Sequence, residues 1–330
     1  MDALVEIQNV STYFKSEQGV VKAVDTLDLR IHEGETVCIV GESGCGKSAA
    51  AMSLMGLIPE AVGSIVSGEI WFAGRDLRKV SKEEMRKLRG NELAMIFQEP
   101  MSSLNPVLTI GEQIMEPIME HQGLSKKVAQ ARAIELIELV GIPRAKEIAK
   151  SYPHELSGGM LQRIMIAIAI AISCNPRLLI ADEPTTALDV TIQAQILDLL
   201  RKIKEEAQTA ILFITHDLGF VAEMADQVVV MYAGKVVEVS PVVELFEEPK
   251  HPYTQGLLRS KPVLNQRRAK LYSIPGQVPN PTTLGEACYF LDRCDQCLAI
   301  CRVKQPPLRD GGDGRKVACW LYEEEIAGGK

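Results

Sequence analysis

The stretch Gly41-Glu-Ser-Gly-Cys-Gly-Lys-Ser48 decides the fold, because it matches the pattern G-x-x-x-x-G-K-[ST] at every defined position. Glycines in such a loop let the backbone curl until its N–H groups converge on one phosphate. A short apolar run, Glu35–Val40, is typical of a buried parallel strand, and an apolar helix follows from Ser48. This order predicts a phosphate-binding loop and disfavours a glycine turn with a stray lysine. The residues expected to contact the phosphates are Gly41, Ser43, Gly44, Gly46, Lys47 and Ser48.

The side chains at the end of the loop indicate a nucleotide bound with Mg²⁺. Lys47 is expected to reach the β- and γ-phosphates, and the Ser48 hydroxyl is expected to ligate Mg²⁺. The helix that begins near Lys47 directs the positive end of its dipole at the same anion.

A second apolar strand, Leu178–Ala181, ends in two acids that extend the predicted site. A strand beside the phosphate loop would bring Asp182 to the Mg²⁺ shell. Glu183, one residue further, is expected to polarise the attacking water as general base. Such a strand end is a weak signal alone and a strong one together with the glycine loop. At this point a kinase, a GTPase and a helicase all stay open.

Short apolar runs divide the rest of the chain into strands and helices. Residues 4–31 alternate apolar and polar side chains around the polar turn 15–19, which predicts antiparallel strands. Helical periodicity runs over about residues 108–149, and a further buried strand is predicted at 210–214. Strands that alternate with helices predict a parallel α/β sheet. Proline becomes more frequent after about residue 240, where we expect an accessory region.

One motif narrows the family: Leu156-Ser157-Gly158-Gly159-Met-Leu-Gln162-Arg163 resembles the signature of ABC ATPases with its usual tail. Chemically it is a second anion site, in which a serine and two glycines open an apolar helix. Two such sites in one chain suggest that Ser157, Gly158 and Gly159 serve the nucleotide of a partner subunit. A simple helix cap would be the better explanation of Ser-Gly-Gly alone, but the other motifs stand in register with it.

The remaining motifs follow in the order that the ABC family requires. Gln98 resembles the glutamine that senses Mg²⁺ and touches the permease, so it is expected among the Mg²⁺ ligands and the catalytic groups. Residues 187–189 resemble the D-loop, which includes Asp189. His216 ends the third strand and resembles the switch histidine that contacts the γ-phosphate, a role that its position favours over a structural one.

An aromatic residue near the start of the chain is expected to stack on the adenine ring. Phe14 fits this role, Tyr13 is its rival, and a core aromatic is the plainer alternative. The resemblance covers Leu4 to about Ser240 and implies an α/β P-loop NTPase with a RecA-like parallel sheet core. It also implies an antiparallel β subdomain, an α-helical signature subdomain and a small cysteine-rich C-terminal extension.

The resemblance sets the predicted domain boundaries. Residues 1–240 are expected to form the ABC ATPase domain, with a helical subdomain at about 100–165. Residues 241–330 are expected to form the extension found in oligopeptide transporters.

Three stretches resemble the ATPase subunits of bacterial oligopeptide and dipeptide importers: Gln98–Pro106, Tyr152–Leu156 and His251–Thr254. The resemblance covers almost the whole chain and implies an enzyme that hydrolyses ATP to power peptide import. Such importers combine two different ATPase subunits with two permease subunits and an extracytoplasmic peptide-binding protein. Nickel importers are close relatives, so both peptides and nickel stay open as cargo.

Five of the eight cysteines lie after residue 287, which in a cytoplasmic chain favours metal ligation over disulfides. The pattern of the branch, C-x5-C-x6-C-x17-C, comprises Cys288, Cys294, Cys301 and Cys319. Thiolates at these spacings can hold a [4Fe–4S] cluster or Zn²⁺, and we favour the cluster because the paired short knuckles of structural zinc are absent. Cys297 interrupts the pattern and is treated as a spare thiol. The cluster is expected to clip the tail together rather than to catalyse redox chemistry.

Composition and charge restrict the remaining function classes. The net charge of −7 argues against a nucleic-acid partner. The first ten residues have no basic start followed by an apolar core, so no secretory signal is predicted. The longest apolar run, Ile164–Ile172, has nine residues and reads as a buried helix, since about 20 are needed to span a bilayer. We therefore expect a peripheral protein at the cytoplasmic face of the membrane.

Two other classes of function stay open. One is a soluble ABC ATPase of DNA repair or translation, although repair ATPases need long coiled-coil insertions and translation ATPases usually carry two cassettes in one chain. The other is a sensor in which a metal cluster regulates the ATPase. Substitution of the tail cysteines separates these cases, because a sensor would lose its response whereas a clip would lose stability first.

Overall fold

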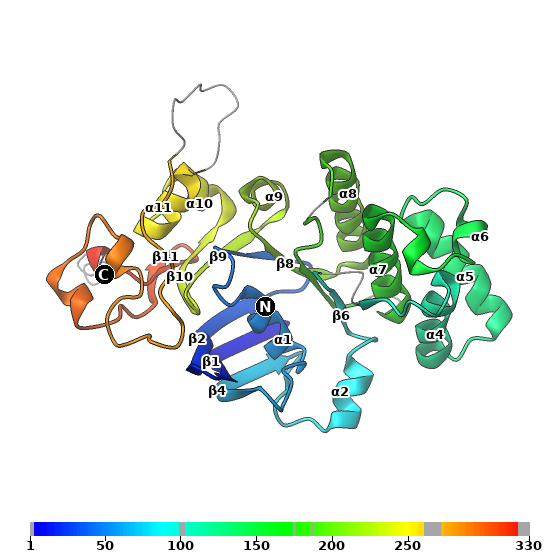
Figure 1. The fold of residues 1–330 in the computed structure, drawn as a ribbon, viewed down its shortest axis with the longest axis horizontal. Helices are drawn as coiled ribbons and strands as arrows, with labels where there is room; N and C mark the ends of the chain where they lie inside the picture. The colour runs from blue at the N-terminus through cyan, green and yellow to red at the C-terminus, as the bar shows by residue number, and fades with distance from the viewer. Residues whose placement is uncertain (1–2, 99–102, 174–175, 187, 261–271, 323–330) are drawn as a thin grey trace. The chain divides into compact units, whose positions relative to one another are not determined.

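The computed structural model describes residues 3–98, 103–173, 176–186, 188–260 and 272–322, which form two compact units (Figure 1). Unit 1 consists of Met1–Ile31, Thr36–Arg78 and Thr215–Lys330. Unit 2 consists of His32–Glu35 and Lys79–Ile214. The boundary near residue 240 divides the sequence in another way, and it stays a prediction.

An antiparallel sheet in unit 1 is formed by the beginning of the chain. Its strands are β1 (Val5–Ser16), β2 (Gly19–Ile31), β4 (Gly63–Phe72) and β5 (Arg75–Asp76), in the order β2-β1-β4-β5. β1 pairs with β2 from Val5 opposite Ile31 to Ser16 opposite Gly19. This sheet is the antiparallel subdomain that the alternation of apolar residues predicts.

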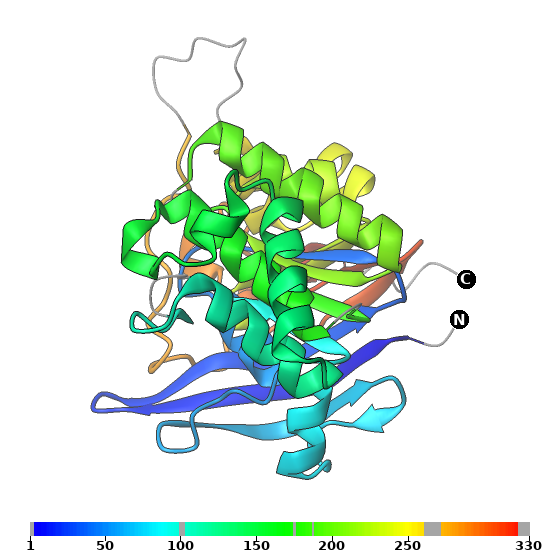
Figure 2. The same cartoon turned by 90° about the vertical axis from the view of Figure 1, so that its right-hand side faces the viewer.

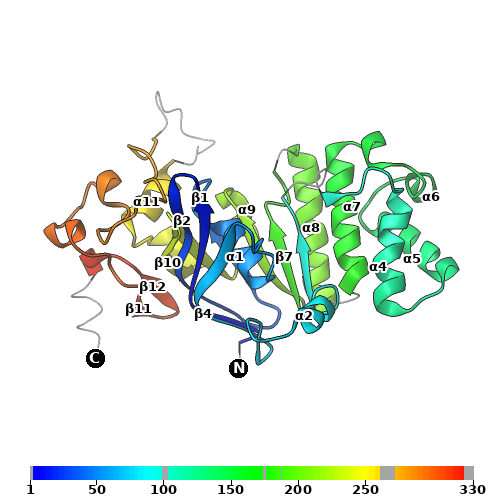
Figure 3. The ribbon, with the colours of Figure 1, turned by 60° about the horizontal axis from the view of Figure 1, so that its bottom comes forward.

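The strand before the phosphate loop lies in a second sheet. β3 (Thr36–Val40) runs parallel to β9 (Gln227–Tyr232). β9 pairs antiparallel with β10 (Lys235–Pro241), β10 with β12 (Arg315–Val317), and β12 with β11 (Arg309–Gly312). Figure 3 labels β10, β12 and β11. All five residues of β3 are buried, as expected for an apolar parallel strand. The last part of the chain thus joins the sheet that carries the phosphate loop.

Short helices complete unit 1. They are α1 (Lys47–Leu54), α9 (Leu218–Met224), α10 (Val242–Glu247) and α11 (Pro252–Arg259), with 3₁₀ turns η2 (Leu291–Arg293), η3 (Ala299–Arg302) and η4 (Trp320–Tyr322). α11 begins with Pro252 at its first position, and the His251 side chain accepts the N–H of Tyr253 as a cap. The 3₁₀ turns belong to the cysteine-rich extension, which has little regular structure of its own.

Unit 2 combines three parallel strands with a group of helices. The strands are β6 (Leu93–Ile96), β7 (Leu178–Asp182) and β8 (Ala210–Thr215), and all of their residues are buried. The helices are α2 (Lys82–Leu88), α4 (Ile110–Gln122), α5 (Lys126–Leu139), α6 (Ala145–Ile148), α7 (Gly158–Ser173) and α8 (Val190–Ala207), with the 3₁₀ turn η1 (Pro153–Glu155). Parallel strands and helices of this kind confirm the predicted α/β class.

Helices α4, α5 and α7 pack against one another and form the green group in Figure 2. α7 contains the longest apolar run of the sequence, and Ile164 and Ile166 are fully buried in it. α4 approaches the end of α6 closely at Gly111, whose N–H donates to the Ala149 carbonyl at 2.8 Å. A Cβ atom at Gly111 would lie only 2.6 Å from that oxygen. Within the described residues, no helix is both long enough and apolar enough to cross a membrane.

Candidate functional site

The phosphate loop of unit 1 is a closely packed turn. Gly41, Gly44 and Gly46 have φ values of 154°, 79° and 103°, which L-residues with side chains rarely adopt. A Cβ atom at Gly41 would overlap the carbonyl oxygen of Met231, and one at Gly46 would overlap that of Ala23. Glycine is therefore required at both positions, where the loop passes directly over the backbones of β9 and β2.

The lysine of the loop is buried and bonded to the loop backbone. Lys47 is 5% exposed, and its Nζ donates to the carbonyl oxygens of Gly41 at 2.9 Å and Glu42 at 3.2 Å. Ser43 and Gly44 are exposed, so this side of the loop is open to a ligand. A buried cation at the N-terminus of α1, in a loop of glycines, provides the chemistry that a phosphate chain needs.

Phe14 and Tyr13, the two candidates for adenine stacking, are neighbours in β1 and therefore point to opposite faces of the sheet. Phe14 is half-buried and lies against Gly63, where a Cβ atom would come within 2.6 Å of its Cδ1. The Tyr13 hydroxyl donates to Asp25 Oδ1 at 3.5 Å. Burial, and then the charge of Asp25, raise the pKa of Tyr13. A packed face of Phe14 is compatible with stacking on its other face, so both assignments stay predictions.

His216 also lies in unit 1, exposed in the turn between β8 and α9. The Thr215 hydroxyl accepts the N–H of Asp217 at 3.0 Å, and Asp217 Oδ1 accepts the N–H of Gly219 at 2.7 Å. These two bonds fix the turn on both sides of His216 and cap α9. The histidine is thus presented on a short, well-bonded turn.

Glu183 of unit 2 has a strained backbone and a side-chain oxygen that accepts two hydrogen bonds. Asp182 ends β7 and is buried, whereas Glu183 has a φ of 46°, a left-handed conformation that is unusual for a residue with a side chain. Its Oε2 accepts hydrogen bonds from Gln98 Nε2 at 3.3 Å and from Thr186 Oγ1 at 2.9 Å. The structure therefore brings together two predicted residues, Gln98 and Glu183, and adds Thr186, which the sequence analysis did not identify. Backbone strain of this kind is common where a side chain must be aimed at a reaction.

The signature serine and the D-loop aspartate each begin a helix of unit 2. Ser157 Oγ accepts the N–H three residues on at 3.4 Å, and Asp189 Oδ1 accepts the N–H of Ile192 at 3.0 Å. A Cβ atom at Gly158 would meet nothing within 4 Å, so this side of the N-terminus of α7 is open. Gly159 instead faces Ile192 of α8. Both polar side chains thus act as caps, and an open helix N-terminus remains beside Ser157.

Parts of two predicted motifs lie outside the described residues. These are Ala187 of the D-loop and residues 99–102 of the stretch that follows Gln98.

Arg163, at the end of the signature motif, binds three elements of unit 2 together. Its guanidinium donates to the carbonyl oxygens of Gly141 at 3.0 Å and Val140 at 3.4 Å, which end α5, and to Gln195 of α8. This contact gives the arginine of the motif a structural role that the sequence pattern does not reveal.

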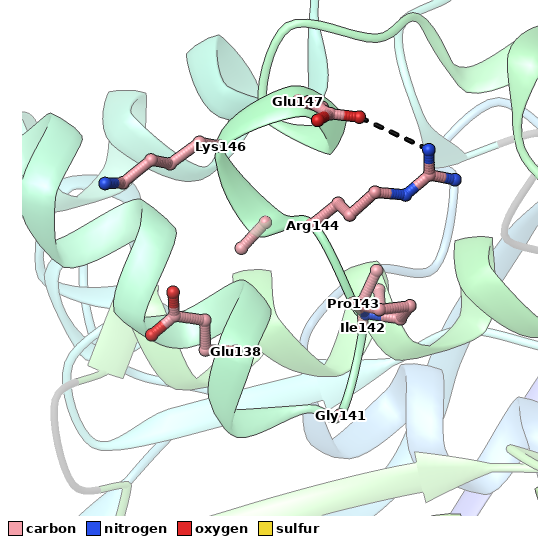
Figure 4. A pocket seen from close by; sticks show the side chains of 8 residues that line it. Glu138, Gly141, Ile142, Pro143, Arg144, Lys146 and Glu147 are labelled. Carbon is pink, nitrogen blue, oxygen red and sulfur yellow. Dashed lines mark ion pairs between the residues drawn. The ribbon is translucent and has the colours of Figure 1, made fainter.

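An open hollow of about 540 Å³ lies at the α5–α6 turn, and Figure 4 shows its lining residues. Arg144 and Glu147 form an ion pair of 3.4 Å at its edge, and both side chains are mostly exposed. Exposed pairs of this kind contribute little to stability or recognition. None of the residues predicted to bind nucleotide or metal lines the hollow.

The predicted cysteines of the extension line one enclosed cavity: Cys288, Cys294, Cys301 and Cys319. Its free volume is about 20 Å³, room for roughly one water molecule. Burial raises the pKa of Cys288 to about 11 and that of Cys319 to about 12. Among the described residues, no three His, Cys, Asp or Glu side chains gather closely enough to hold one metal ion. The packing therefore does not fit Zn²⁺, whose four thiolates at about 2.3 Å would have to converge on one point.

The chain matches two protein families. The family described as ABC transporter matches residues 24–186, and the one described as oligopeptide/dipeptide transporter, C-terminal region, matches residues 237–301. The oligopeptide transport ATP-binding protein AppD of Bacillus subtilis is 53% identical over 327 residues, which is 99% of each chain. The dipeptide transport ATP-binding protein DppD of Bacillus subtilis is 45% identical and covers 98% of this chain and 96% of its own length.

Among solved structures, the ATP-binding cassette MJ0796 has a similar fold. Its dimeric post-hydrolysis state with ADP and Pi matches with a TM-score of 0.65 and 28% identity, over 72% of this chain and 98% of that one. This likeness confirms the predicted cassette fold.

Proposed function

Because the chain belongs to the ATP-binding subunits of ABC transporters, in the oligopeptide and dipeptide branch, we propose that it hydrolyses ATP to power peptide import through a membrane permease. The observation that carries this proposal is the 53% identity to an oligopeptide transport ATP-binding protein over 99% of both chains. The match includes the C-terminal region as well as the ATPase. Shared residues over the whole length support a shared task better than a shared fold does.

We assign the nucleotide contacts to the phosphate loop. Lys47 would contact the β- and γ-phosphates, and the N–H groups of the loop would hold the β-phosphate. Mg²⁺ bound with ATP would be held by Ser48, Gln98 and Asp182, and it would neutralise charge on the transferred phosphate. The fit rests on the loop geometry, since Gly41 and Gly46 let the loop pack closely on the strands beneath it while Ser43 and Gly44 stay exposed.

Glu183 is our candidate general base. Its carboxylate would polarise the attacking water, and the hydrogen bonds from Gln98 and Thr186 support it in one orientation. His216 would contact the γ-phosphate from its bonded turn. Hydrolysis of this type depends on positioning and charge neutralisation, which polar groups on short, rigid turns supply.

We infer that a second, homologous ATPase subunit completes the site. The open N-terminus of α7, with Ser157 and Gly158, offers N–H groups to a partner's nucleotide, and Asp189 stands at the neighbouring helix start. Two permease subunits and an extracytoplasmic peptide-binding protein would form the rest of the importer. The chain would work at the cytoplasmic face of the membrane, with Gln98 near the permease.

We further infer that Cys288, Cys294, Cys301 and Cys319 hold a [4Fe–4S] cluster. The donor set fits in kind and number, and a four-iron cluster accepts thiolates that are spread wider than those around a single ion. The free volume of the cavity is small, so the cysteine side chains would have to turn around the cluster. Anaerobically purified protein should contain iron and sulfide, and Cys294→Ala should lose both. Cys297→Ala is the matched control, because Cys297 does not line the cavity.

The test of function is ATPase activity of the purified chain, alone and in lipid with its permease and partner ATPase. Strong stimulation by the assembly and by a peptide-loaded binding protein is the expected result. Lys47→Ala in the same assembly should abolish it. Activity that is indifferent to permease and peptide would contradict the transport assignment.

A further inference from the structure

The cysteine-rich extension touches the phosphate loop of its own chain. We propose that Arg293 and Tyr253, from the C-terminal part of unit 1, are positioning residues that hold the phosphate loop in its ATP-binding shape through Glu42. The inference rests on ATP binding by the loop, and it assigns a role to residues outside every nucleotide motif. All the contacts that carry it lie within unit 1.

Both terminal nitrogens of the Arg293 guanidinium donate hydrogen bonds to the carboxylate of Glu42. Nη1 lies 2.6 Å from Oε2 and Nη2 lies 3.0 Å from Oε1, a bidentate geometry that fixes direction as well as distance. The Arg293 side chain is only 4% exposed. Its Nε donates to the Pro275 carbonyl at 2.9 Å, and Nη1 also donates to the Tyr232 hydroxyl at 3.3 Å. The arginine is thus held on all sides and cannot follow the loop if the loop moves.

Tyr253 holds the backbone of the same residue. Its hydroxyl accepts the N–H of Glu42 at 2.9 Å, and the Tyr253 side chain is fully buried. The ring packs against Tyr232 of β9 and Phe290 of the extension, with ring centroids 4.7 Å and 5.5 Å apart. Aromatic packing of this kind makes the hydroxyl a rigid acceptor.

Glu42 passes this restraint to the lysine of the loop. Its carbonyl oxygen accepts a hydrogen bond from Lys47 Nζ at 3.2 Å and another from the N–H of Cys45 at 3.2 Å. The carboxylate, the N–H and the carbonyl of Glu42 are therefore all used, the first two by Arg293 and Tyr253. A shift of Glu42 would move both the turn of the loop and the lysine that contacts phosphate.

The negative charge of Glu42 gives Arg293 a second role in ATP binding. Glu42 places a carboxylate in the loop that must accept a triphosphate, and like charges at short range repel each other. Arg293 neutralises that carboxylate. Removal of the arginine alone would leave an unpaired anion beside the phosphates, and removal of both charges would not.

The extension also supports the strand under the loop. The Tyr289 hydroxyl donates to Asp25 Oδ2 at 3.0 Å, and Asp25 lies two residues after Ala23, the residue on which Gly46 rests. The extension is thus joined by Tyr289 to β2, the strand beneath the phosphate loop, and by Arg293 to Glu42 at the start of the loop.

The experiment measures ATP affinity of the purified full-length chain by calorimetric titration, together with KM and kcat of the importer complex. Arg293→Met should weaken ATP binding by about tenfold, because it removes the bidentate contact and leaves the Glu42 carboxylate unpaired beside the phosphates. Arg293→Lys keeps the positive charge but cannot make the bidentate contact, so its ATP affinity should lie between those of Arg293→Met and the wild type. The double variant Glu42→Gln/Arg293→Met removes the repulsion but also the bidentate contact, so its ATP affinity should lie between those of Arg293→Met and the wild type. Tyr253→Phe keeps the ring and should weaken binding by roughly threefold to tenfold.

Arg302→Met is the matched control, since Arg302 belongs to the same extension and is exposed. A purely structural arginine would lower the unfolding midpoint while the folded protein kept its ATP affinity and KM, and that result would overturn the proposal. A double variant that bound ATP as tightly as the wild type would also overturn the proposal, because the bidentate contact would then contribute nothing. Lys47→Ala tests separately whether the loop binds ATP at all. If the wild type binds ATP no better than Lys47→Ala, then ATP binding by the loop is refuted, and not only the role of Arg293.

Discussion

Gly46 and Gly44 offer a matched pair of substitutions in one loop. Both have positive φ values, 103° and 79°, so alanine at either position forces a side chain into the left-handed region. That conformation costs about 1–2 kcal/mol, of which about 0.4–1 kcal/mol is returned because alanine restricts the unfolded chain. Only at Gly46 does the new methyl group meet an obstacle, the carbonyl oxygen of Ala23; at Gly44 nothing lies within 4 Å.

The overlap sets the expected difference between the two variants. A Cβ atom closer than 3.0 Å to a backbone oxygen requires the strand or the loop to move, and overpacking of this kind costs about 1–3 kcal/mol. We expect Gly44→Ala to lower the free energy of unfolding by about 1 kcal/mol and Gly46→Ala by about 3 kcal/mol. With a denaturant slope near 2 kcal/mol/M, the urea midpoints of the two variants should differ by about 1 M.

Tryptophan fluorescence suits the measurement, because both tryptophans, Trp71 and Trp320, belong to unit 1 with the loop. The titration is made without nucleotide, so that phosphate binding does not contribute. Equal midpoints for Gly44→Ala and Gly46→Ala would mean that β2 gives way at no cost, and would refute the close packing of the loop on Ala23.

Three further predictions concern single side chains. Glu183→Gln should bind ATP within about threefold of the wild type and hydrolyse it at least about 100-fold more slowly, leaving an ATP-trapped dimer in size-exclusion chromatography; normal turnover would exclude Glu183 as the base. Phe14→Ala should weaken ATP binding by about tenfold and Tyr13→Ala by less than threefold, since base stacking is worth about 1–3 kcal/mol; the reverse order would give the adenine to Tyr13. Burial raises the pKa of Glu238 in the folded protein, so the folded state favours the protonated carboxyl group. The resulting stabilisation is complete below about pH 4.5 and is lost as the pH rises through the raised pKa. Relative to Glu238→Gln, the wild type should therefore lose stability as the pH rises above about 4.5, in urea titrations at several pH values; a constant difference would contradict this.

Local patterns in the sequence predict the parts of the site that depend on local structure. The phosphate loop is recognisable because its glycines, lysine and serine stand within eight positions. The strands before it and before Asp182 are recognisable because buried parallel strands need continuous apolar runs. The capping box Ser81–Glu84 at the start of α2 is local in the same sense, because its pattern S-x-x-E is a helix-start signal.

Contacts between distant parts of the chain leave no comparable pattern. Nothing near Glu42 indicates that an arginine 251 residues later will bind its carboxylate, or that Tyr253 will accept its N–H. Thr186 was missed for a different reason: it lies near Glu183, but its bond depends on the left-handed turn at Glu183. The cysteine pattern predicted a shared metal group, whereas the cavity that the four cysteines line is seen only in the structure.

The bond between Glu42 and Arg293 also sets an order of events during synthesis. A ribosome that adds about 5–20 residues per second needs roughly 13–50 s to pass from one partner to the other, a separation of 251 residues. The strands around the phosphate loop can pair during that interval, but the loop gains its second support only when the last part of the chain emerges. A nascent chain that has not yet reached residue 293 therefore carries the complete loop motif without the arginine that holds it.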